Sequence, residues 1–120
     1  MKKNEAIKTI NMRTGSNSLN NSNTHFANVN TAKNVWWFDI PTSKAFSQNI
    51  SHLHLLVYQN DRNELYHLKV PTSFFIKNKS SFIVREEKKT ISLELSAYSS
   101  NFLKDVRPGS GQLSFDEFLQ

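Results

Sequence analysis

The hydrophobic pattern of residues 51–70 predicts a β-hairpin around which the rest of the chain is arranged. Two arms rich in aliphatic and aromatic residues flank a polar four-residue turn at residues 60–63. Successive side chains of a strand point to opposite faces, so the pairing register decides which face is apolar. Pairing Gln59 with Glu64 makes one face wholly apolar, because it gathers every second residue of both arms: Leu53, Leu55, Val57, Tyr66, Leu68 and Val70. We therefore expect this register, with the apolar face in the core.

The same register predicts a mixed second face on the hairpin. Three cross-strand pairs make up this face: His54 with Lys69, Leu56 with His67, and Tyr58 with Leu65. An antiparallel sheet often buries one face and leaves the other in contact with solvent. We therefore take the mixed face as the candidate binding surface.

Alternation elsewhere in the chain predicts three further strands. The first covers residues 35–40, with Trp37 and Asp39 on its outer face. Residues 82–85 and 91–97 are expected to form a second hairpin across a charged turn. The later strand has the most regular alternation in the chain, and its polar residues are expected to point away from the core: Ser92, Glu94 and Ser96.

Pro-Thr-Ser occurs at residues 41–43 and again at 71–73, each time directly after a predicted strand. Proline lacks the N–H that a strand ladder needs, and Thr and Ser hydroxyls cap helices. Each copy therefore predicts the end of a strand and the start of a short capped helix, with a duplicated recognition loop as the alternative. Ser114 and Glu117 have the spacing of a capping box and predict a last short helix that docks on the sheet.

The order of these elements predicts an α+β fold. We expect a five-stranded, mostly antiparallel sheet with short helices packed on one face. The same order, with a helix between the third and fourth strands, is also that of an OB-like small β-barrel. The barrel therefore stays open as the alternative architecture.

The N-terminal part of the chain differs from the rest in composition. Residues 1–34 are expected to form a flexible, basic, Asn/Ser-rich segment that precedes a single domain over residues 35–120. Residues 2–12 can form a short helix, which would need a partner to dock on because isolated helices of this length are marginal in water. Residues 14–24 have little to bury and indicate a linker, and residues 25–30 indicate a loop or a short edge strand.

Composition excludes several classes of protein. The 120 residues include no cysteine, which excludes disulfides and thiolate metal sites. No apolar run approaches the roughly 20 residues that span a bilayer, so we expect a cytoplasmic protein with no membrane contact. The net charge of +5 lies mainly in residues 1–34, where five basic residues and one acidic residue give +4; residues 35–120 contribute ten basic and nine acidic residues, or +1.

Our leading hypothesis from these patterns is a small non-enzymatic binding protein that associates with single-stranded nucleic acid. Its contact residues would be those of the mixed hairpin face together with the outer face of the neighbouring strand: Trp37, His54, Tyr58, His67 and Lys69. Aromatic rings stack on unpaired bases, and cations meet phosphates. The basic N-terminal arm would add salt-sensitive attraction that does not depend on the base sequence.

Two alternatives remain open. A protein-interaction module, such as an inhibitor, an immunity partner or a subunit of a larger complex, fits the near-neutral folded part equally well. A metal-dependent nuclease would draw on Asp39 and the hairpin histidines His52, His54 and His67 as ligands, with Lys69 stabilising developing negative charge. No second carboxylate accompanies this set, and no nucleophile has a base beside it, so we predict no catalytic residues, no metal and no cofactor.

Overall fold

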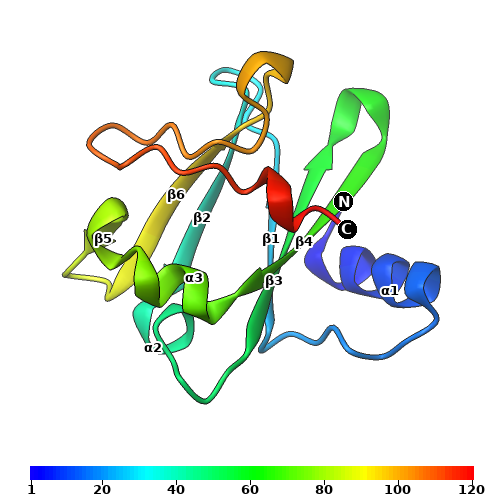
Figure 1. Cartoon of the computed structure of the whole chain (residues 1–120). Helices are drawn as coiled ribbons and strands as arrows, with labels where there is room; N and C mark the ends of the chain where they lie inside the picture. The colour runs from blue at the N-terminus through cyan, green and yellow to red at the C-terminus, as the bar shows by residue number, and fades with distance from the viewer.

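Six strands form two three-stranded sheets in the computed structural model, which describes all 120 residues (Figure 1). Sheet A contains, in spatial order, β1 (Thr24–Asn28), β3 (His52–Gln59) and β4 (Glu64–Pro71). Sheet B contains, in spatial order, β2 (Val35–Pro41), β6 (Thr90–Ser96) and β5 (Ile83–Arg85). All neighbouring strands are antiparallel except β1 and β3, which run parallel.

Three α-helices accompany the sheets: α1 (Lys3–Thr14), α2 (Thr42–Ala45) and α3 (Thr72–Lys77). α2 and α3 follow β2 and β4 directly and contact each other at one end of the molecule (Figure 1). α1 packs against Leu56 and Leu65, on the face of sheet A that points away from the core. The α+β class is thus confirmed. No helix has both the length and the apolar character required to cross a lipid bilayer.

The predicted register of the central hairpin is confirmed. Gln59 pairs with Glu64, and the ladder continues to His52 opposite Pro71. The turn is a short 3-10 helix that ends at Asn63, whose φ of 50° is a left-handed conformation that asparagine tolerates better than most residues. The apolar face of the hairpin lies in the core as expected, since Leu55 and Leu68 are both fully buried.

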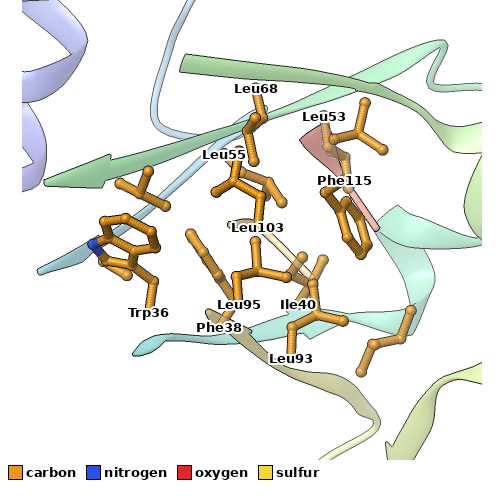
Figure 2. Packing of buried hydrophobic residues seen from close by; sticks show 14 of the residues in the cluster. Trp36, Phe38, Ile40, Leu53, Leu55, Leu68, Leu93, Leu95, Leu103 and Phe115 are labelled. Carbon is orange, nitrogen blue, oxygen red and sulfur yellow. The ribbon is translucent and has the colours of Figure 1, made fainter. Parts of the chain in front are cut away.

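The main hydrophobic core lies between the two sheets and contains 18 buried residues. Figure 2 shows leucines of β3 and β4 facing the aromatic and aliphatic side chains of β2 and β6. On β2 the fully buried Trp36 and Ile40 point inward, and Trp37 points outward, as the alternation predicted. Leu103 and Phe115 reach the same core from the C-terminal part of the chain.

A cluster of phenylalanine rings holds the C-terminal residues against the core. Phe115 is fully buried, and its ring packs edge-to-face on that of Phe74 in α3 with centroids 5.3 Å apart. Phe118 packs on the same ring at 4.8 Å. The predicted last helix is a single 3-10 turn, Asp116–Phe118, which docks on the sheet as expected. The predicted capping box is not formed, because Phe115 occupies the N-cap position and the Ser114 hydroxyl donates to the Asp116 side chain at 2.8 Å.

The single five-stranded sheet is not formed, and the two sheets do not close into a barrel. β1 joins the hairpin as a sixth strand, and β2 pairs with β6 instead of lying beside β3 or β4. The physical reason is that alternation specifies which face of a strand is apolar but not which strand lies next to it. Pairing β2 with β6 produces a second apolar face, which covers that of the hairpin.

The two Pro-Thr-Ser segments end strands and begin helices as predicted, but without side-chain capping. Neither helix has a side-chain hydrogen bond at its N-cap. The Thr42 hydroxyl donates instead to the Lys89 carbonyl at 3.2 Å, and the Thr72 hydroxyl donates to the Ile50 carbonyl. Each threonine therefore joins the start of its helix to a neighbouring loop.

The polar side of β6 points away from the core as predicted, yet it is buried. Ser92 and Glu94 are each 6% exposed and Ser96 is 1% exposed. Residues 101–107 cover them: Ser96 donates to the Asn101 side chain at 2.5 Å, and Glu94 accepts from Arg107 at 3.2 Å.

Residues on both sides of the boundary predicted at residue 34 pack into one body. α1 and the edge strand β1 occupy the positions suggested by the pattern, and β1 pairs with β3 along its whole length. Between them Leu19 is buried, and the Asn11 amide binds both the N–H and the carbonyl of Leu19, at 3.1 and 2.9 Å. The N-terminal segment therefore lies against sheet A, with α1 packed on Leu56 and Leu65.

Candidate functional site

The five residues selected from the sequence do not share one open face. His54 and His67 lie together on the face of sheet A that carries α1, Lys69 is exposed on β4, and Tyr58 lies near the hairpin turn. Trp37 lies on the outer face of sheet B, across the core from the hairpin. The expected combined surface requires β2 beside the hairpin, and the pairing of β2 with β6 prevents it.

His54 and His67 form a buried, hydrogen-bonded pair. His54 Nδ1 lies 2.8 Å from His67 Nε2, and the rings are 7% and 8% exposed. Burial lowers the pKa of His54 to about 4, and repulsion from His67, Lys69 and His52 adds to the effect. Burial also lowers the pKa of His67, with further repulsion from Lys69 and Arg13. Both rings are therefore neutral at pH 7 and offer no cation to a phosphate.

Tyr58 stabilises the hairpin turn. Its hydroxyl donates to the Asn63 side chain at 2.6 Å, and its ring packs beside the cluster under α1. Tyr58 is therefore held against the protein on both sides, which leaves it less available as a stacking platform than the sequence suggested.

Trp37 is the exposed aromatic residue of sheet B, with 48% of its surface accessible. The ammonium of Lys33 lies 5.1 Å from the centre of its ring. A small cavity of about 190 Å³ adjoins it, with Arg85 and Arg107 in its walls. Both arginines are paired with carboxylates, Arg107 with Glu94 at 3.2 Å and Arg85 with Asp39 at 3.7 Å. The surface around Trp37 is thus aromatic but nearly neutral.

The ligand set of the metal-dependent nuclease is not assembled. Asp39 is paired with Arg85 on sheet B, whereas His54 and His67 lie on sheet A. No three His, Cys, Asp or Glu side chains of the chain gather closely enough to hold one ion. The cause is again the pairing of β2 with β6, which carries Asp39 away from the histidines.

A cleft opens at the end of the molecule, between the hairpin turn and residues 97–102, with a volume of about 530 Å³. We call it the end cleft, and it is lined by aromatic and polar residues: Asn34, Gln59, Asp61, Arg62, Tyr66, Tyr98 and Phe102. A neighbouring hollow of about 370 Å³ shares three of these residues. Ligand sites typically have volumes of about 300–1,000 Å³, so the end cleft is large enough to hold a ligand.

The floor of the end cleft is a packed aromatic group. The rings of Trp36, Tyr66 and Phe102 meet edge-to-face, with centroid separations of 6.4, 5.8 and 5.4 Å. Trp36 is fully buried and donates its ring N–H to a backbone carbonyl at the end of β3, at 3.0 Å. The Tyr66 hydroxyl donates to Glu64. The floor is therefore held in place from both sheets.

The rim of the end cleft carries groups that are free to bind. Tyr98 is 57% exposed. Four polar side chains around it form no side-chain hydrogen bond and no ion pair within the chain: Asn34, Gln59, Asp61 and Arg62. Most other asparagines of the chain are engaged in local hydrogen bonds, as Asn63 is with Tyr58. The end cleft thus combines a rigid aromatic floor with unpaired donors and acceptors.

The end cleft was not predicted from the sequence. Most of its residues come from the hairpin turn, the β1–β2 loop and the segment after β6, which show no periodicity, whereas Gln59 and Tyr66 lie in β3 and β4. The available signals were local: an all-polar turn at residues 59–62, and Tyr98 in a run of serines. These signals become a site only when the two sheets bring the three loops to one end.

No protein-family model matches the chain, and no curated protein or solved structure matches it either.

Proposed function

We propose that this protein is a protein-interaction module that holds an extended segment of a partner protein in the end cleft. The observation that carries the proposal is the cleft of about 530 Å³, with its aromatic floor and its unpaired polar rim. Tyrosine and arginine are enriched at the centres of protein interfaces, and here Tyr98 and Arg62 stand at the opening.

The polar rim suits a polypeptide backbone. Side-chain amides such as those of Asn34 and Gln59 donate and accept hydrogen bonds at once, as the peptide groups of an extended segment require. Asp61 and Arg62 cancel in charge, so a polyanion gains little electrostatic attraction here. A peptide that inserts an aromatic or aliphatic side chain above Tyr66 would bury it against the ring floor.

Selection from a phage-displayed library of random linear peptides tests this proposal. We expect selected peptides to bind the protein at least about tenfold more weakly when Tyr98→Ala is introduced, the size of effect typical of an interface anchor. Met12→Ala is the matched control, because Met12 is 74% exposed and lies on α1. Peptides that bind both variants equally, or a selection without enrichment, would reject the end cleft as the binding site.

Nucleic-acid association is the second candidate, and one observation favours it. Four basic residues and one acidic residue lie on α1 or directly before it: Lys2, Lys3, Lys8 and Arg13, against Glu5. Fluorescence-polarisation titrations with single-stranded DNA, duplex DNA and RNA at about 50 and 200 mM salt test it, since phosphate contacts weaken steeply with salt. Negligible binding to all three at the lower salt concentration would exclude this candidate. A pull-down from the source lysate with and without nuclease treatment separates the two candidates.

A further inference from the structure

α1 is attached to the protein by a small contact that is separate from the main core. It contributes Ala6 and Ile10 to a cluster of five buried residues, completed by Leu19, Leu56 and Leu65. The 18-residue core between the sheets contains no residue of α1. A helix of 12 residues is marginal by itself in water, so α1 depends on this contact. Its release would leave the core intact.

The surface under α1 has the shape and polarity of a helix-binding groove. Ala6 and Ile10 are four residues apart and therefore lie on one side of the helix, which is the pattern of helix-in-groove recognition. Leu56 and Leu65 form the apolar centre of the surface, and the His54–His67 pair continues it on the same face of the hairpin. We call these four hairpin residues the α1 docking face.

Like charges meet at both ends of this contact. At the start of α1, Lys3 donates to the Asn21 carbonyl at 3.1 Å, and Lys44 donates to the adjacent Ser22 carbonyl at 2.6 Å. Burial lowers the pKa of Lys3, and the nearby ammonium of Lys44 lowers it further. Burial also lowers the pKa of His25, and the charges of Lys3 and Lys44 add to that effect.

The other end of α1 shows the same arrangement. Arg13 donates to the Leu65 carbonyl at 3.2 Å, and after desolvation by burial both Lys69 and Arg13 lower the pKa of His67. The charged groups that act on the histidine pair are all basic. The carboxylates of the region are bound locally, since Glu5 accepts from the Lys2 N–H and Glu64 accepts from a tyrosine hydroxyl. A basic helix thus occupies a basic surface.

We propose that the α1 docking face is a binding groove for an acidic amphipathic helix of a partner protein, and that α1 is the intramolecular occupant which such a helix replaces. Acidic side chains at the two ends of the helix would turn the repulsion around Lys44 and Lys69 into attraction. The apolar centre of the groove favours a helix over a nucleic acid, because a sugar-phosphate chain would leave Leu56 and Leu65 uncovered.

A pair of synthetic peptides tests this proposal. One has the sequence of residues 1–14, and the other carries Glu in place of Lys2, Lys3, Lys8 and Arg13. We expect the acidic peptide to bind the full chain at least about tenfold more tightly than the native-sequence peptide at low salt, measured by fluorescence anisotropy. Ile10→Asp, which removes the apolar anchor of α1, should strengthen this binding at least about tenfold. Near-UV circular dichroism of the buried Trp36 checks that the core of this variant is folded.

Two surface variants keep the test decisive if Ile10→Asp fails to fold. Lys3→Glu should strengthen the docking of α1 beside Lys44 and weaken binding of the acidic peptide severalfold. Lys69→Glu should weaken the same binding by removing a cation from the groove. Tyr98→Ala, in the end cleft, is the control and should leave binding of the acidic peptide unchanged. A failure of the α1 proposal is therefore distinguishable from a failure of the proposed function of the end cleft. Equal binding of the two peptides, or tighter binding of a single-stranded DNA oligonucleotide than of the acidic peptide, would overturn the proposal.

Discussion

Acidification should loosen the contact between α1 and the hairpin, and the buried histidines determine the pH at which this happens. His54 has a pKa of about 4 in the folded protein, against an ordinary value of 6.5, because burial disfavours its charged form. Between these two values the unfolded chain binds more protons than the native protein. Stability is therefore fully present above about pH 6.5 and falls as the pH drops toward 4.

The magnitude follows from the displacement of the pKa. The pKa of His54 is 6.5 in the unfolded chain and about 4 in the folded protein, and each unit of difference is worth roughly 1.4 kcal/mol. His54 therefore changes the free energy of unfolding by about 3 kcal/mol when its titration is complete. About 2 kcal/mol of this is lost between pH 7 and pH 5. His67 and His25 act in the same direction, since burial and neighbouring lysines lower the pKa of each. The total is a substantial fraction of the roughly 5–15 kcal/mol that stabilises a domain.

Two measurements check this prediction. Urea unfolding followed by tryptophan fluorescence at pH 7 and pH 5 gives the global free energy of unfolding. Amide hydrogen exchange, corrected for its intrinsic pH dependence, reports whether α1 loses protection before β3 and β6 do. We expect both the free energy and the protection of α1 to fall at pH 5. The double variant His54→Leu/His67→Leu replaces both partners of the hydrogen bond by apolar groups and should reduce the pH dependence.

The control for this variant is His52→Gln, because His52 is only partly buried and its ring contacts the Ser51 hydroxyl at 3.1 Å. It should retain most of the wild-type pH dependence, because His52 is the smallest of the contributors to the lowered pKa of His54. An unchanged pH dependence in the double variant would refute the reasoning, because the effect would then have to come from groups other than the buried pair.

Three further predictions concern side-chain and backbone packing and are checked by urea unfolding at pH 7. Trp36→Phe should lower the free energy of unfolding by about 1–3 kcal/mol, because it removes a buried hydrogen bond and ring volume. Trp37→Phe is the control: its position is 48% exposed, and it should change stability by less than about 0.5 kcal/mol. Phe115→Ala should cost about 3–5 kcal/mol, because the ring is fully buried; a loss below about 1 kcal/mol would contradict the packing described. Gly111→Ala should destabilise the protein, since an added Cβ would lie 2.8 Å from that of Ser81, and wild-type stability would contradict this contact.

The sequence by itself determined the local features of this protein. Pairing Gln59 with Glu64 was the register that gathered the apolar residues of both arms on one face, and the structure has that register. The same reasoning placed Trp36 inward and Trp37 outward on β2, and the prolines at positions 41 and 71 marked the ends of two predicted strands. These features depend on the period of the strand and on the chemistry of neighbouring residues, which are both local properties.

Only the tertiary structure decided how these elements meet. Alternation makes one face of β2 apolar but does not specify its neighbour, and the pairing with β6 took Trp37 and Asp39 away from the hairpin. The mixed face of the hairpin looked suited to solvent, yet α1 covers it and makes His54 and His67 a neutral pair. The end cleft arises where three loops without periodicity converge beside Tyr66 of β4. Each of these outcomes depends on contacts between segments far apart in the chain. Burial, the charge state of a side chain and the shape of a cavity are properties of the packed molecule, and no single stretch of sequence determines them.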